Sequence, residues 1–285
     1  MSLLTVLVTV IAVVSVMLVI GAIVCIDRRQ LRTLRAELRP RLRLAAPSIA
    51  LLAVVLVINS LTRTAIQQLS WLIGFEITSL IYRIEGAFVA SLQAFESPEL
   101  TLYLSFIYVY GYVFLLVFPL LAYLALDDQR PLHELSLAYA VNYGLGLLCY
   151  LLFIAYGPRN LDVAQQLMYN VYPQSRLLTS AVNSNTNVFP SLHTSLSVTV
   201  ILFAWRTRDP YPRWLAIATV IGVSVVVSTM YLGIHWGIDV VAGTVLAVVS
   251  FEVGTRGVDR WHRIVKTPAV TNQLRHRFGR SREDR

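Results

Sequence analysis

The chain has 285 residues, of which 56% belong to the class AVILMFWYC and only 14% are charged. Soluble domains carry about a quarter charged residues, so this composition excludes an ordinary water-soluble domain and a disordered chain. The formal net charge of +8 could suggest a nucleic-acid partner, but the basic residues lie in short stretches between apolar runs, which is typical of membrane topology signals.

Apolar runs of about 20 nearly uncharged residues predict an all-α polytopic transmembrane bundle. The first run has no basic stretch ahead of it and no small-residue cleavage pattern, so we interpret it as a span rather than a signal peptide. The chain then divides into an N-terminal span with a basic connection (1–44), a membrane domain (45–255) and a basic tail (256–285). The predicted spans are about 3–26, 45–66, 101–126, 135–156, 191–206, 214–232 and 236–254.

The stretch 67–97 is ambiguous. Its apolar residues follow helical spacing, but Glu76, Arg83 and Glu85 interrupt them. We therefore expect an amphipathic helix at the interface or against the bundle, not an eighth span.

Charge placement supports seven spans and sets their direction. The connections 27–44, 127–134 and 206–213 and the tail 256–285 then share one side, with 7, 1, 3 and 9 basic residues, or 20 of the 24 in the chain. The positive-inside rule predicts an integral cell-membrane protein with its N-terminus outside and its C-terminus in the cytoplasm.

The two cysteines, Cys25 and Cys149, both lie inside apolar runs. They indicate neither a disulfide framework nor a zinc site. We expect no metal and no cofactor, and the expected partners are membrane lipids.

Two histidines point to chemistry. His193 is at the external mouth of the fifth predicted span and His235 at that of the seventh, so the chain returns to the same face between them. Asp239 follows His235 by four residues, on the same helix face, where its carboxylate can bind one ring nitrogen and leave the other free as a nucleophile or base. An alternative is that Asp239 and His235 only satisfy each other between helices.

The residues before His193 suggest an anion site. Pro190 and Ser191 are typical of a helix start, and the backbone N–H groups of a first helical turn bind anions. A phosphate held there could be attacked by His235, while His193 gives a proton to the leaving group.

Arg159 is the candidate cation for that phosphate, because it follows the fourth span on the external side and a guanidinium can bind two phosphate oxygens. Arg176, in the same connection, is a second candidate. For both, the alternative is an interfacial arginine without a ligand.

These motifs resemble those of the type 2 phosphatidic acid phosphatase superfamily, membrane branch. Pro190-Ser191-Leu192-His193 is similar to its Pro-Ser-Gly-His signature, and the segment from Ser228 to Asp239 is similar to its Ser-Arg-x5-His-x3-Asp signature. The resemblance covers about residues 135–255. It implies a six-helix core, here with an extra N-terminal span, and a metal-independent phosphoryl transfer. In that reaction His235 would be the nucleophile, Asp239 its orienting group, His193 the acid and Ser191 a phosphate ligand.

The chain departs from the family at two cations. The first-signature lysine is absent, and Thr229 stands where the second signature has arginine. Fewer cations favour a singly charged phosphodiester over a phosphomonoester, and the motifs look closer to those of inositol-phosphoryl ceramide synthases. We therefore expect a lipid phosphatase or phosphotransferase at the extracytoplasmic face. The alternatives are a transferase that moves a phosphoalcohol head group between lipids, and a non-catalytic protein that binds or transports phospholipid.

Overall fold

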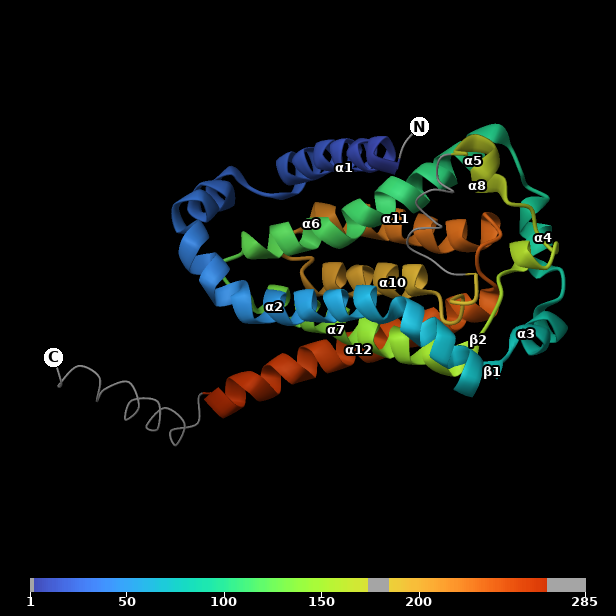
Figure 1. Cartoon of the computed structure of the whole chain (residues 1–285). Helices are drawn as coiled ribbons and strands as arrows, with labels where there is room; N and C mark the ends of the chain where they lie inside the picture. Colours follow the sequence, from blue (N-terminus) through green and yellow to red (C-terminus); the bar gives the residue numbers. More distant parts are fainter. Residues whose placement is uncertain (1–2, 174–184, 266–285) are drawn as a thin grey trace.

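The computed structural model describes residues 3–173 and 185–265, and these form one bundle of long helices with short elements at one end (Figure 1). The long helices are α1 (Leu3–Cys25), α2 (Arg28–Ile73), α5 (Pro98–Phe106) with the π-helical η1 (Ile107–Gly111) and α6 (Tyr112–Leu124), α7 (Arg130–Leu152), α10 (Leu192–Arg206), α11 (Pro212–Tyr231) and α12 (Gly237–Val265). The short elements are β1 (Phe75–Glu76), α3 (Thr78–Glu85), α4 (Phe88–Gln93), β2 (Phe153–Ile154), η2 (Pro158–Asn160) and α8 (Leu167–Val171). The predicted all-α polytopic bundle is confirmed.

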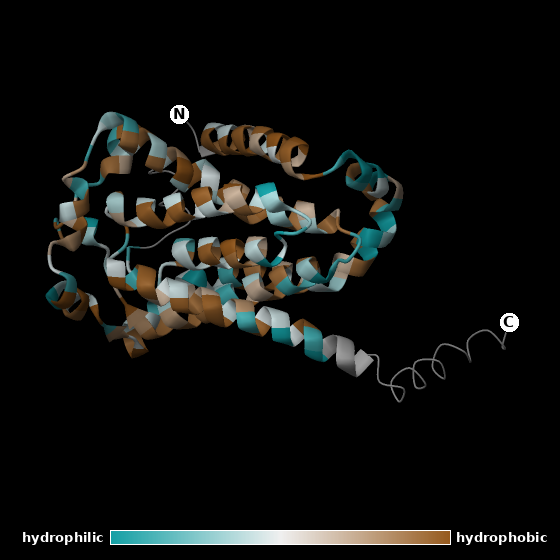
Figure 2. Ribbon diagram, turned by 180° about the vertical axis from the view of Figure 1, so that it is seen from behind, coloured by the Kyte–Doolittle hydropathy of each residue, from teal (hydrophilic) through white to brown (hydrophobic). Residues whose placement is uncertain are grey.

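Six helices in the described part of the chain are long and apolar enough to cross a membrane. They correspond to six of the seven predicted spans. The remaining one, α10, has 15 residues and is therefore roughly 22 Å long, which is less than the hydrocarbon thickness of about 30 Å. It packs against α7, α11 and α12 inside the bundle. Figure 2 shows that apolar residues predominate along the helices and that hydrophilic residues gather where α1 leads into α2 and toward the end of α12.

The core between α6, α10 and α11 is aromatic. Trp214 is fully buried, and its ring lies 4.7 Å from that of Phe118, centroid to centroid. Gly21 lets α1 approach this cluster, because a Cβ at that position would lie 2.8 Å from the Phe118 ring. This close packing joins the N-terminal span to the core.

The basic connections meet at one end of the bundle, which we call the arginine-rich end. The guanidinium of Arg41 binds the carbonyls of Leu124 and Leu126 and the carboxylate of Asp127. Arg213 donates a hydrogen bond to the carbonyl of Val24. The connections that the charge count placed together are therefore together in the structure.

A single amphipathic helix over 67–97 is a wrong prediction. Helix α2 continues to Ile73, Gly74 ends it, and β1 then pairs in parallel with β2. Helices α3 and α4 follow, separated by Gly86, which has a φ of 57° that ends α3. The expected amphipathic character is present in pieces, since Ile81 and Val89 are buried while Phe88 is exposed. The elements of 75–93 lie at the end opposite the arginine-rich end (Figure 1).

Candidate active site

The structure brings the two histidines together. His193 lies in the first turn of α10, and His235 lies in the turn 232–236 between α11 and α12. Their ring centroids are 6.4 Å apart and the rings are inclined by 53°. The two side chains that the spacing of spans placed on one face therefore share one site.

The ring of His193 is held between two tyrosines. Its centroid lies 4.5 Å from that of Tyr108 and 4.3 Å from that of Tyr112. Both tyrosines come from the π-helical stretch η1 and the start of α6. Contacts with two aromatic rings restrict the motion of the His193 ring. These tyrosines were not predicted from the sequence, although their spacing of four residues on a helix was visible.

The turn that carries His235 is tightly bonded to α11. The amides of Ile234 and His235 both donate to the carbonyl of Thr229, each at 3.0 Å. Gly233 has a φ of 71°, and a Cβ there would lie 2.7 Å from the carbonyl oxygen of Gln165. Glycine is required at this position for both reasons. The His235 side chain is only 3% exposed.

Asp239 lies next to His235, but not on one helix face as expected, because His235 precedes α12 and Asp239 is in its first turn. Its Oδ2 is 3.5 Å from Nδ1 of His235, an ion-pair distance longer than a hydrogen bond. The same oxygen accepts the N–H of Trp236 at 2.8 Å, and the backbone carbonyl of Asp239 accepts the N–H of Ser191 at 3.1 Å. Within the described residues, Nδ1 of His235 and Oδ1 of Asp239 are buried without a hydrogen-bond partner. The contact that would orient His235 is therefore close but not fully made.

Burial keeps His235 neutral. It lowers the pKa of His235 to about 3, with a further lowering from the positive charge of Arg159 and a partial offset from a hydrogen bond to the Val188 backbone. Around neutral pH the imidazole is therefore unprotonated, the form that can attack phosphorus.

Arg159 borders the same site. Its guanidinium lies over the ring of Tyr169, 5.4 Å from the centroid. The preceding Gly157 allows the turn to approach the His235 turn, because a Cβ there would lie 2.3 Å from the carbonyl oxygen of Ile234. Arg176 lies outside the described residues.

Ser191 caps α10. Its hydroxyl accepts the N–H of Thr194 at 3.3 Å, and the residue is fully buried. The helix start that the sequence predicted at Pro190 and Ser191 is confirmed, while the contact of Ser191 with phosphate remains a prediction. Thr229 is also fully buried, and its hydroxyl donates to the carbonyl of Val226 at 2.7 Å. The position of the family arginine thus holds a small, internally bonded side chain.

A cavity of about 520 Å³ is lined by both histidines and by Arg159. Its polar lining includes His193, His235, Arg159 and Asn187, together with Arg63 of α2, a cation that was not predicted as part of the site. Its apolar lining comes from α1, α2, α6, α7 and the first residue of α10, and includes Leu7, Val10, Leu56, Ile66, Val113, Leu147 and Leu192.

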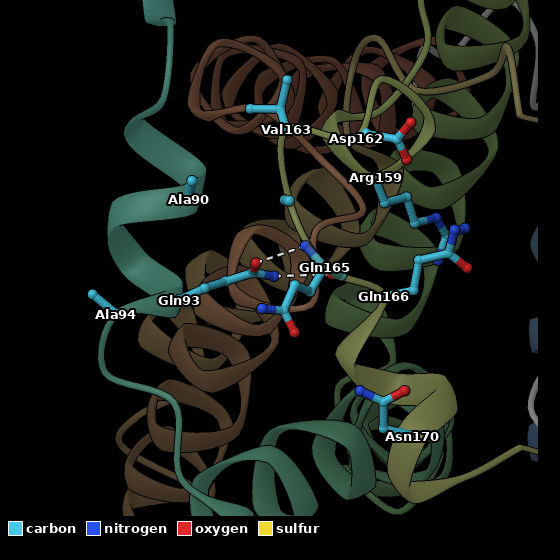
Figure 3. A pocket seen from close by; sticks show the side chains of 10 residues that line it. Ala90, Gln93, Ala94, Arg159, Asp162, Val163, Gln165, Gln166 and Asn170 are labelled. Atoms are coloured by element: carbon cyan, nitrogen blue, oxygen red, sulfur yellow. Dashed lines mark hydrogen bonds between the residues drawn. The ribbon is translucent and has the colours of Figure 1, made fainter.

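A second pocket, of about 620 Å³, shares Arg159 with the cavity and is lined mainly by polar side chains of α4 and 162–170 (Figure 3). Within residues 3–173 and 185–265, no three His, Cys, Asp or Glu side chains gather in a group that could hold a metal ion.

Comparison with known proteins gives one match. A sequence model described as PAP2 superfamily matches residues 70–253, which include α3, α4 and every site residue described above except those of α1 and α2. No curated protein and no solved structure matches the chain.

Proposed function

The chain belongs to the PAP2 superfamily, a family of phosphatase-type phosphoester hydrolases and transferases, and we propose that it acts on a lipid phosphate through a phosphohistidine formed on His235. The observation that carries this proposal is the 6.4 Å separation of the His193 and His235 rings at one cavity. Attack and proton transfer each need heavy atoms about 3 Å apart, so a phosphate group fits between these imidazoles.

The reaction has two balanced steps. In the first, a nitrogen of His235 bonds to phosphorus, the bond from phosphorus to the leaving oxygen breaks, and protonated His193 gives its proton to that oxygen. In the second, the oxygen of water or of an alcohol bonds to phosphorus, the bond from phosphorus to the His235 nitrogen breaks, and His193 takes the proton of the attacking hydroxyl, so that both histidines return to their starting forms. The negative charge of the bound phosphate favours the protonated form of His193 before the first step, and Arg159 supplies a fixed positive charge to the phosphate oxygens.

The cavity wall supports a lipid substrate. The polar groups lie together at the histidines, and the apolar side chains of α1, α2 and α7 provide a lining against which acyl chains can pack. The positive-inside rule favours an orientation with this end of the bundle at the extracytoplasmic leaflet, the N-terminus outside and the arginine-rich end in the cytoplasm.

Transfer of a phosphoalcohol head group, as in the inositol-phosphoryl ceramide synthase-like subgroup, is the second candidate. The buried Thr229 favours this candidate. A site without the arginine at this position has less positive charge, which is enough for a phosphodiester monoanion but balances a phosphomonoester dianion less well.

The proposal is tested by trapping the intermediate. Purified protein in detergent is mixed with a lipid phosphomonoester carrying ³²P, or with a phosphodiester labelled in its phosphoalcohol, and quenched in alkali, where phosphohistidine persists. We expect label on the wild type and none on His235→Ala. An unlabelled wild-type protein that still binds the lipid would instead support the non-catalytic alternative. Free alcohol acceptors then separate hydrolysis from transfer by the product formed.

A further inference from the structure

The turn that carries His235 is held from outside by a segment distant in sequence. Glu85, the last residue of α3, accepts the N–H of Gly237 at 2.7 Å on one carboxylate oxygen and the N–H of Ile238 at 3.0 Å on the other. Glu85 was one of the charged residues that interrupted the apolar pattern of 67–97, and the reaction proposed above gives it no task.

These two hydrogen bonds bear on where α12 begins. The first amides of a helix have no partner within the helix, and they form its positive end. Glu85 satisfies two of them, and Asp239 satisfies the N–H of Trp236 just before them. Two carboxylates therefore fix the first turn of α12. This turn contains Asp239 and is separated from His235 by Trp236 alone. Because the amides of Trp236, Gly237 and Ile238 already donate to these carboxylates, they are not free to bind a substrate phosphate.

The other end of the turn is held in the same way. Gln93, the last residue of α4, is only 8% exposed. Its side-chain nitrogen donates to the carbonyl of Tyr231 at 2.8 Å, where α11 ends. The same side chain makes two hydrogen bonds with the backbone of Gln165, drawn as dashed lines in Figure 3. Glu85 and Gln93 thus hold opposite ends of the turn 232–236.

Trp236 fixes the turn between them. It is fully buried, and its indole N–H donates to the carbonyl of Tyr156 at 2.8 Å. The ring of Tyr82, on α3, meets it edge to face at 6.2 Å. The residue after His235 is therefore clamped by α3 on one side and by the 153–160 stretch on the other.

The geometry points to Glu85 as a positioning residue for His235, which sets the start of α12 so that the Asp239 carboxylate reaches the nucleophile's ring. This inference rests on the proposed function. Glu85 is not among the residues that line the cavity, so it acts through the backbone of Gly237 and Ile238 and not on the substrate. Loss of its carboxylate shifts His235 relative to Asp239 and to the phosphate, which lowers turnover and leaves lipid binding unchanged.

The test compares Glu85→Ala, which removes both acceptors, with Glu85→Gln, which keeps the size and one acceptor oxygen. Glu76→Gln is the matched control, because it removes a charge from the same segment, and among the described residues the Glu76 carboxylate bonds only to Thr78 and Ser79 of that segment. A displacement of about 1 Å at a reacting group can cost up to about a hundredfold in rate. We expect kcat to fall at least tenfold in Glu85→Ala and less in Glu85→Gln, with KM unchanged and Glu76→Gln like the wild type.

Two further measurements separate positioning from a general loss of structure. In an Asp239→Asn background, Glu85→Ala should lower kcat less than twofold, because both act through the same contact. Hydrogen exchange of the resting protein should be faster in peptides covering 233–241 in Glu85→Ala, and unchanged in Glu76→Gln.

A wild-type kcat in a folded Glu85→Ala protein would overturn the inference. So would a double variant in which Glu85→Ala lowers kcat of Asp239→Asn by as large a factor as it lowers kcat of the wild type. If Glu85→Ala does not fold, Glu85→Gln takes its place. A Glu85→Gln protein with the turnover of the wild type and with the same hydrogen exchange over 233–241 would also overturn the inference. Absence of a phosphohistidine in the wild type would end the proposed function, whereas the exchange measurement judges the role of Glu85 at the turn without any turnover.

Discussion

The backbone N–H of Arg159 donates a hydrogen bond of 3.1 Å to the carbonyl oxygen of Gly233. One turn carries the candidate phosphate-binding cation and the other carries the candidate nucleophile two residues further on. Because backbone atoms make this bond, it fixes the position of the two turns relative to each other whichever rotamers the side chains adopt. The site is therefore sensitive to changes in the backbone between these turns.

Gly157→Ala tests that sensitivity. Its new Cβ would lie 2.3 Å from the carbonyl oxygen of Ile234, so the His235 turn must move. We expect turnover to fall at least tenfold and the protein to lose about 1–3 kcal/mol of stability. Gly144→Ala on α7 is the control, since nothing lies within 4 Å of its Cβ; a thermal melt and a turnover assay of each variant are the measurements. Equal behaviour of the two variants would refute the close approach.

Asp239→Asn should keep the fold and lose the reaction. The asparagine oxygen can still accept the Trp236 N–H, now bonded at 2.8 Å, but it no longer favours the correct tautomer or the charge that develops on His235. We expect a loss of about a hundredfold or more in kcat, with an unchanged melting temperature. A variant that turns over at the wild-type rate would exclude any orienting role of this carboxylate.

His193→Gln should slow the reaction according to the leaving group. A lipid alcohol needs a proton as it leaves, whereas an activated aryl phosphate does not, so we expect a loss of about 100-fold or more on the lipid and a small loss on the aryl ester. Single-turnover rates on both substrates make the comparison. Equal losses on the two would argue that His193 binds phosphate without donating a proton.

The acid side of the pH profile should be broad. Because the pKa of His235 is lowered to about 3 and not raised, lowering the pH from 7.5 to 5.5 leaves this ring unprotonated. Phosphoenzyme formation from an aryl phosphate should therefore persist at pH 5.5. Arg159→Gln removes one cause of the lowered pKa, so its acid limb should move to higher pH. A wild-type rate that falls with an apparent pKa near 6.5 would show that the nucleophile is not buried in this way.

Arg63→Gln should weaken binding of an anionic lipid, because this cation lines the cavity from α2. We expect KM for the lipid to rise about threefold to tenfold, with kcat for a short aryl phosphate nearly unchanged. Arg83→Gln is the control, since Arg83 is exposed on α3. Lipid KM values that agree between the two variants would remove Arg63 from the site.

The sequence predicted the helices and the meeting of the two histidines because both depend on local periodicity and on counting membrane crossings. Helical spacing also predicted Asp239 beside His235; the two side chains do lie 3.5 Å apart, but His235 is in the turn before α12 and not on the helix. The chain did not reveal the break of 67–97, where Gly74 and Gly86 override a helical pattern and β1 pairs with a strand far along the chain.

The residues that surround or position the histidines could not be predicted from the sequence, for another reason. Tyr108, Tyr112, Arg63 and Glu85 reach the site only through contacts between elements far apart in sequence. A single sequence gives no register between such elements. In the sequence, Glu85 is only a charged residue within an apolar pattern. A charged residue on a solvent-exposed helix face would produce the same pattern.

At the arginine-rich end, the carboxylate of Glu134 is fully buried and binds Arg130 at 2.7 Å and Arg206 at 2.8 and 3.0 Å. Arg206 ends α10, and Arg130 also pairs with Asp259 near the end of α12. Arg206 supplies two of these three hydrogen bonds and follows Glu134 by 72 residues, whereas Arg130 precedes Glu134 by one helical turn. A chain that ends before α10 keeps Arg130 as a partner of Glu134 but lacks the two hydrogen bonds from Arg206, so its α7 should be held less firmly in the bundle.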